Sequence, residues 1–253
     1  MDRYALEDDE KDSDGLQDDF TYSEHIYLGS PKKPITVADV ATLSASRSFR
    51  DFCKKLTLFL NDFLPQANIP IPGGTGIVIV RETDKVSISY SLSAPAAFLL
   101  LCTQLQEFRY LKVNYESHVD WKTATDYLRC NPNFHGHERY DCALVRITDR
   151  LNNDKVMVVR LQFMFEYTIG EATLRLVLVM PLDFPTGKTR AIDEDLRLIR
   201  LRTRAAASSQ IIPLRSIIRG ALLVPDFARD GDYFLVNYID SDMFLRSQTL
   251  TSE

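Results

Sequence analysis

Residues 156–181 read VMVVRLQFMFEYTIGEATLRLVLVMP, and this stretch decides the fold class. Its two parts, 156–168 and 173–181, are rich in Val, Leu, Ile and Phe, which favour β-strands. Side chains of a strand alternate between its two faces, so we expect the more apolar face of the first part to be the core face. That face carries Met157, Val159, Leu161, Phe163, Phe165 and Tyr167.

The chain around this stretch is also strand-rich. Residues 143–147 precede it and are joined to it by a turn at Asn152 and Asn153. Further strand candidates follow at 196–203, 210–212, 217–224 and 233–238. Strands spaced this closely, without intervening helices of about 12 residues, favour an antiparallel sheet or a small barrel over a parallel sheet.

The N-terminal part has a helical pattern. Apolar residues recur at three- and four-residue steps and predict one buried helix face. They are Phe49, Phe52, Cys53, Leu56, Phe59, Leu60 and Phe63. Pro65 predicts that this helix ends at Leu64. We expect a hairpin of strands 77–80 and 85–92, a second helix over 96–108 that begins near Pro95, and one or two helical turns over 123–129.

The sequence therefore predicts an α+β fold, in which an N-terminal helical part packs on a predominantly antiparallel β-sheet or small β-barrel. The predicted divisions are a disordered acidic tail (1–30), the helical part with its hairpin (36–107), the β-rich domain (108–246) and a short tail (247–253). Residues 1–24 carry ten acids and two bases, so the remaining chain has 25 acids and 28 bases. Such an acidic, weakly apolar segment favours disorder.

Composition excludes several classes of protein. No apolar run approaches the roughly 18 residues that a membrane span needs. The acidic N-terminus has no apolar segment of the kind found in signal peptides. We expect an intracellular protein, nuclear or cytoplasmic, whose four cysteines are reduced.

Residues 108–147, FRYLKVNYESHVDWKTATDYLRCNPNFHGHERYDCALVRI, concentrate the unusual side chains. Together with VVRLQFMFEY, IIPLRSIIRGALLVPDF and DYFLVNYIDSDMFLR, this stretch resembles a mostly uncharacterised family of proteins from mushroom-forming fungi. The resemblance covers about residues 47–246. Members of that family are associated with DNA transposons of the Plavaka and Kyakuja-Dileera-Zisupton type. The resemblance implies no established activity and no cofactor.

Two sets of residues in this region are candidates for catalysis. Cys130, His135, His137 and Cys142 supply the ligand types of a tetrahedral zinc site, although no Cys-x2-Cys or His-x3-His pair is present. The alternative is that the cysteines are buried apolar thiols. Carboxylates also lie here and near the C-terminus, and their spacing selects no catalytic set. They are Asp120, Asp126, Asp141, Glu166, Asp240 and Asp242.

The strongest binding candidate is basic. Residues 188–219 contain eight Lys or Arg against three acids. Arg200, Arg202 and Arg204 alternate and would project from one face of a strand towards phosphates, and Arg215 and Arg219 would extend the patch. The alternative is a solvated sheet edge protected by charge.

The aromatic residues predict a structural joint between the two parts of the chain, because their rings bury large areas while their polar atoms reach a partner. The residues of this joint are Tyr115, Trp121, Tyr127 and Tyr140, with Asp141 holding the turn beside Arg139. The sequence thus predicts a non-catalytic interaction module for a protein partner or nucleic acid, with no membrane and no identifiable small-molecule substrate. The alternative is a cryptic metal-dependent nuclease or hydrolase.

Overall fold

Two long strands, β10 (Asp154–Ile169) and β11 (Ala172–Asp183), form the central antiparallel hairpin of the protein. The computed structural model describes residues 25–40, 42–43, 46–71, 76–80, 98–101, 104–148, 154–185 and 190–250. Gly170, at the hairpin turn, has a φ of 59°, a left-handed value that glycine adopts without strain. Strands β5 (Gln104–Phe108) and β9 (Cys142–Thr148) pair with different halves of β10.

The ten-stranded sheet built on this hairpin curls strongly. β12 (Ile199–Thr203) and β13 (Gln210–Pro213) pair with β11, and β16 (Asp232–Leu235) pairs with β12. β14 (Ile217–Ala221) borders β9 at one end of the strand order, and β15 (Leu223–Pro225) borders β16 at the other. Only Leu222 separates β14 from β15 in the chain, so the two ends of the sheet meet there. In the described residues the sheets are open, so the predicted barrel alternative is not observed.

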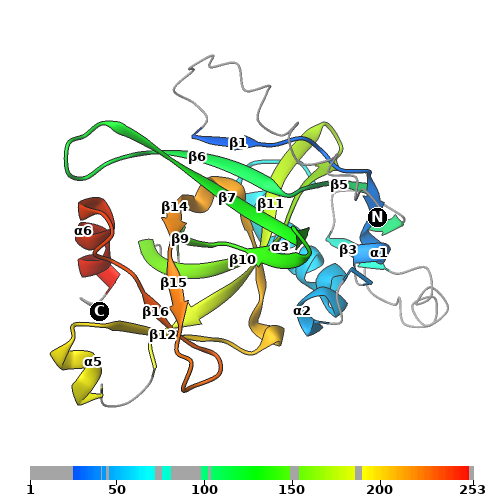
Figure 1. Cartoon of the computed structure of the whole chain (residues 1–253). Helices are drawn as coiled ribbons and strands as arrows, with labels where there is room; N and C mark the ends of the chain where they lie inside the picture. The colour runs from blue at the N-terminus through cyan, green and yellow to red at the C-terminus, as the bar shows by residue number, and fades with distance from the viewer. Residues whose placement is uncertain are drawn as a thin grey trace, which may run out of the picture.

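A second antiparallel sheet lies over the first. It has the strand order β1 (Ile26–Leu28), β6 (Tyr110–Glu116), β7 (Thr123–Phe134) and β8 (His137–Tyr140). Figure 1 shows the β6–β7 hairpin reaching across the molecule to α6 (Ser241–Leu250), with α1 (Val37–Val40), α2 (Arg47–Arg50) and α3 (Phe52–Gln66) on the opposite side. The remaining elements are β2 (Ile35–Thr36), the parallel pair β3 (Ile77–Val80) and β4 (Phe98–Leu101), α5 (Ala191–Asp195), and the short turns η3 (Ala206–Ser208) and η4 (Leu214–Ser216).

A bulge in β10 explains how both faces of the central hairpin are buried. Leu161 pairs with Val179 and Phe163 pairs with Leu178, so Gln162 is an extra residue. A bulge of this kind shifts the alternation of side chains along the strand. Leu161 therefore packs under β6 and β7, whereas Phe163 packs against α3. The prediction that one face of β10 is the whole core face was wrong.

Three apolar cores result. The helix core lies between α3 and the far half of the β10–β11 hairpin, and it includes all seven residues of the predicted helical stripe, buried or packed against it. This part of the sequence prediction is confirmed. The hairpin core lies between β6–β7 and the large sheet. The curl core lies inside the curled sheet and is covered by Met243 and Leu250 of α6.

Several predicted elements differ from those observed. Residues 98–101 and 104–108, the described part of the predicted helix, are strands, and the pairing of the second strand with β10 brings Leu105 into the helix core. Residues 123–129 belong to β7, which pairs with β6 along its length. Helix α3 continues through Pro65 to Gln66. The helical hydrogen bonding continues past the proline, since the Ala67 amide donates to the Phe63 carbonyl at 2.9 Å.

The boundaries of the predicted tails also change. Residues 26–28 form β1, paired with β6, and α6 extends to Leu250, so both tails are shorter than predicted. Residues 1–24 and the predicted strand 85–92 lie outside the described residues. None of the helices that the structure describes has both the length and the apolar character needed to cross a membrane.

Candidate functional site

Four of the five arginines of the predicted basic patch are paired with carboxylates. Arg200 is 8% exposed and is surrounded by three carboxylates. Its Nε donates to Asp193 at 2.7 Å, and its Nη1 donates to Asp226 at 2.6 Å and to Asp232 at 3.2 Å. Arg202 Nε donates to the same Asp232 at 2.6 Å. These guanidiniums hold α5, the loop after β15 and the start of β16 together.

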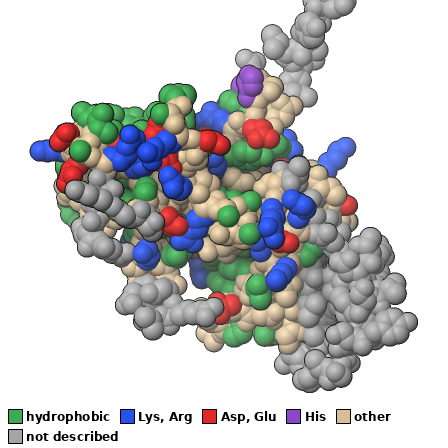
Figure 2. Space-filling model, turned by 90° about the horizontal axis from the view of Figure 1, so that it is seen from below, with side chains coloured by type: hydrophobic (Ala, Val, Ile, Leu, Met, Phe, Trp, Pro, Cys, Tyr) green, Lys and Arg blue, Asp and Glu red, His purple; other side chains and the backbone are tan. Residues whose placement is uncertain are grey.

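Arg204 is exposed but paired with Asp183, with Nη2 and Oδ1 2.6 Å apart. On the face seen in Figure 2, Lys and Arg side chains are interspersed with Asp, Glu and apolar ones. The alternating arginines of β12 were therefore a poor guide to a phosphate track, because each has an acidic partner.

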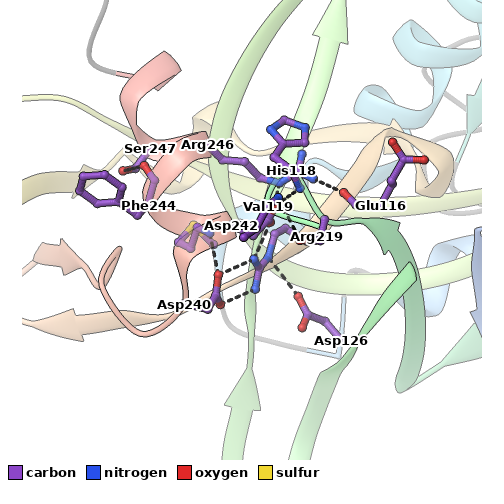
Figure 3. A network of polar contacts seen from close by, with 12 residues as sticks. Glu116, His118, Val119, Asp126, Arg219, Asp240, Asp242, Phe244, Arg246 and Ser247 are labelled. Atoms are coloured by element: carbon purple, nitrogen blue, oxygen red, sulfur yellow. Dashed lines mark hydrogen bonds and ion pairs between the residues drawn. The ribbon is translucent and has the colours of Figure 1, made fainter. Parts of the chain in front are cut away.

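Arg219 is 5% exposed and is the centre of the Arg219 cluster, which consists of Asp126, Arg219, Asp240, Asp242 and Arg246. Its Nη1 donates to Asp242 at 2.7 Å, its Nη2 donates to Asp240 at 2.9 Å, and its Nε lies 3.3 Å from Asp126 Oδ2. Figure 3 shows these groups converging from β7, β14 and α6. Three of the predicted carboxylates thus come together, but around a guanidinium.

Asp242 also fastens the β6–β7 hairpin to α6. It accepts hydrogen bonds from Arg246 Nε and from the His118 amide, each at 2.7 Å. Burial alone would raise the pKa of Asp242, but its hydrogen bonds with Arg246, His118 and Arg219 bring that pKa below the ordinary value. The Arg219 cluster is therefore a structural clamp, with no guanidinium free for phosphate.

The predicted zinc ligands are separated. Cys130 is buried in the hairpin core and Cys142 in the curl core, while His135 and His137 are exposed near the β7–β8 turn. Burial raises the pKa of both thiols, which disfavours the thiolate that zinc needs. The structure therefore does not bring this set together. Within the part of the chain that the structure describes, no group of three His, Cys, Asp or Glu side chains is placed to hold a metal ion.

Only some of the residues assigned to the structural joint are buried or make contacts between segments. Tyr115 of β6 lies near α6, with the Arg219 guanidinium 4.5 Å and the Arg246 guanidinium of α6 5.7 Å from its ring. Asp141 accepts from Arg139 Nε at 3.0 Å and from the Arg129 amide at 2.8 Å, so it holds the turn before β9 as predicted. Tyr140 is half-buried against the hairpin core. Tyr127 and Trp121, however, are 55% and 71% exposed, so they were wrongly assigned to the joint.

A groove beside η4 offers a better binding surface. It consists of two hollows, of about 430 and 380 Å³, that share His25 and Arg215 in their linings. We call it the η4 groove. The second hollow adds Arg146, His118 and Trp121. Of the residues that the sequence predicted as a site, Arg215, Trp121 and Tyr115 meet here.

Two arginines give the η4 groove an uncompensated positive charge. Arg146 and Arg215 have no carboxylate within 4.0 Å in the described ranges, whereas Arg175 is paired with Glu166 and Arg246 with Asp242. Arg215 lies 5.5 Å from the Phe63 ring, which leaves its N–H groups available for an anion. The acidic side chains of the lining are Glu116 and Glu166.

Sequence reasoning missed Arg146, His25 and His118. His25 Nε2 lies 3.0 Å from the Ile217 carbonyl, across 192 residues of sequence. No local pattern indicates such a contact. Arg146 carried a usable signal, since it is the only basic residue in the apolar run 142–147.

Comparisons with known proteins returned no match to a family model, to a curated protein or to a solved structure.

Proposed function

We propose that this protein is a non-catalytic interaction module that binds the sugar-phosphate backbone of single-stranded nucleic acid in the η4 groove. One observation carries the proposal: Arg146 and Arg215, both without an acidic partner in the described residues, line one hollow with the exposed ring of Trp121. Unpaired guanidiniums attract phosphates, and an exposed indole provides a stacking platform for a base.

The dimensions of the groove favour a single strand. The hollow that contains Trp121 has a volume of about 380 Å³ and is lined by residues of β6, β9, η4, β14 and α6. Contacts to phosphates position a strand without reading its sequence. We therefore expect weak sequence preference and a strong dependence on salt. The resemblance to transposon-associated fungal proteins stays a prediction beside this proposal.

The test is binding of a fluorescently labelled oligodeoxythymidylate at low salt, measured by anisotropy. Arg146→Gln and Arg215→Gln should each weaken binding at least about fivefold, because a lost charged contact costs about 1 kcal/mol or more. Arg204→Gln is the matched control, since it removes an arginine that is also exposed but is paired with Asp183. It should leave binding unchanged.

Four outcomes contradict the proposal. The assignment of the binding site to the η4 groove is wrong if Arg204→Gln weakens binding as much as Arg146→Gln. The nucleic-acid ligand is wrong if the wild-type protein does not bind at low salt, or if only an acidic protein competes for the groove. Cleavage of the oligonucleotide by the pure protein with Mg²⁺ would instead support the nuclease alternative.

A further inference from the structure

A third hollow lies where the two ends of the curled sheet meet, and it is distinct from the η4 groove. Its volume is about 440 Å³, and it is lined by β14, Leu222, the loop before α6, and the facing ends of β9 and β10. Its apolar wall includes Leu222, Val236, Ile239 and Met243. This size and mixture of apolar walls with a few polar groups are typical of small-molecule pockets.

The carboxylates in this lining are already satisfied. Asp141 is held by Arg139 and by the Arg129 amide. Asp126 accepts from the Gly220 amide at 2.9 Å and lies beside Arg219. Asp240 accepts from Arg219 at 2.9 Å. Arg139 and Arg219 are therefore neutralised within the lining.

Arg160 is the exception. It is half-buried and lies opposite Cys142 in the β9–β10 ladder, with its guanidinium 4.6 Å from the Tyr233 ring. No carboxylate of the described residues lies within 4.0 Å of it. Its side-chain hydrogen-bond partners are Tyr233 and Cys142, and because a guanidinium has five N–H donors, others remain for a ligand. Among the described residues, Arg160 is thus the arginine of this lining that no carboxylate pairs with.

We propose that this hollow binds a small monocarboxylate with an apolar body, whose carboxylate pairs with Arg160 and whose body lies against Leu222, Ile239 and Met243. A carboxylate matches the fork of a guanidinium through two parallel hydrogen bonds. A single negative charge suits the single unpaired cation. A phosphate dianion would bring a second negative charge, for which the described lining holds no further unpaired arginine. This inference does not depend on the proposed function.

The test uses sodium octanoate as the probe, with octan-1-ol and octyl phosphate as comparisons, in isothermal titration calorimetry with the full chain. We expect octanoate to bind more tightly than either comparison. Arg160→Gln should weaken octanoate binding at least tenfold. Arg146→Gln, a variant in the η4 groove, should leave octanoate binding unchanged, which separates this inference from the nucleic-acid proposal.

A second variant covers the case in which Arg160→Gln fails to fold. Ile239 is 62% exposed at the rim, so Ile239→Trp should fold normally while filling part of the hollow. It should weaken octanoate binding at least fivefold. The proposal is overturned if octan-1-ol or octyl phosphate binds as tightly as octanoate, if no octanoate binding is detected, or if Ile239→Trp leaves the affinity unchanged.

Discussion

Arg219 Nη1 and Asp242 Oδ2 lie 2.7 Å apart, and both side chains are only 6% exposed. The two residues join β14 to α6, and Asp242 also accepts the His118 amide from the tip of the β6–β7 hairpin. Three segments that are distant in sequence therefore depend on one carboxylate. A buried ion pair is seldom a strong source of net stability, but removing one partner leaves the other charge buried and unpaired, which is destabilising.

Asp242→Ala should destabilise the protein by about 3–5 kcal/mol, because it leaves Arg219 and Arg246 buried with less compensation. Asp183→Ala removes the carboxylate of an exposed pair with Arg204 and should cost at most about 1 kcal/mol. Urea denaturation followed by circular dichroism measures both. Equal losses in the two variants would show that the Arg219 cluster does not hold the hairpin to α6.

The helix core gives a second prediction with a matched control. Leu60 is fully buried against the β10–β11 hairpin, whereas Leu58, two positions earlier on the same helix, is 62% exposed. Leu60→Ala should cost about 2–5 kcal/mol through lost apolar burial and the cavity left behind. Leu58→Ala should change the free energy of unfolding by at most about 0.5 kcal/mol. The docking of α3 would be contradicted if Leu58→Ala proved the more damaging change.

Features that depend on residues close together in the sequence, such as the buried face of a helix, could be predicted from local sequence patterns. The step of three and four residues from Phe49 to Phe63 placed the core-facing side of α2 and α3 correctly, because helix geometry brings such residues together. Thr36 and Asp39, which have the three-residue spacing of a capping box, form two hydrogen bonds with each other at the start of α1. The predominantly antiparallel sheet followed from closely spaced strands of branched and aromatic residues.

The candidate site could not be predicted in the same way, because charges are neutralised by residues from other segments. The count of bases over 188–219 left out Asp226, Asp232 and Asp240, which lie after this range and pair with its arginines. Asp126, another member of the Arg219 cluster, accepts from the amide of Gly220, which is 94 residues later in the sequence. The bulge at Gln162 is set by pairing with β11, which a single-strand pattern does not show. Trp121 was assigned to a buried joint by its type, but the turn geometry leaves it outside.

Acid should weaken the Arg200 region. Hydrogen bonds from Arg200 lower the pKa of Asp193, and hydrogen bonds from Arg202 lower that of Asp232. A carboxyl whose pKa is lower in the folded state stabilises that state above the unfolded pKa of about 3.9, and this contribution is lost as the pH falls through the folded pKa. The midpoint of thermal unfolding should therefore be insensitive to these groups above about pH 5 and fall below about pH 4.

Arg202→Gln tests this assignment, because Arg202 is exposed while its partner Asp232 is buried. The variant removes the main cause of the lowered pKa of Asp232, so its unfolding midpoint should depend less steeply on pH between about pH 5 and 3. Thermal denaturation across that range measures the slope for both proteins. An unchanged slope would assign the acid sensitivity to other carboxyls.

Trp121 provides a direct optical test of the η4 groove, because it is the only tryptophan in the chain and is 71% exposed. Stacking of a base on its ring should quench its fluorescence on titration with an oligodeoxythymidylate. Trp121→Ala should weaken binding by about 1–3 kcal/mol, or roughly 5- to 150-fold.

The logarithm of the binding constant should fall linearly with that of the salt concentration, with a slope of about −0.7 per neutralised phosphate. Arg146→Gln and Arg215→Gln should each make that slope shallower by about 0.7, whereas Trp121→Ala should lower affinity at unchanged slope, since a ring neutralises no phosphate. A slope that changes with Trp121 but not with either arginine would place the strand elsewhere on the surface.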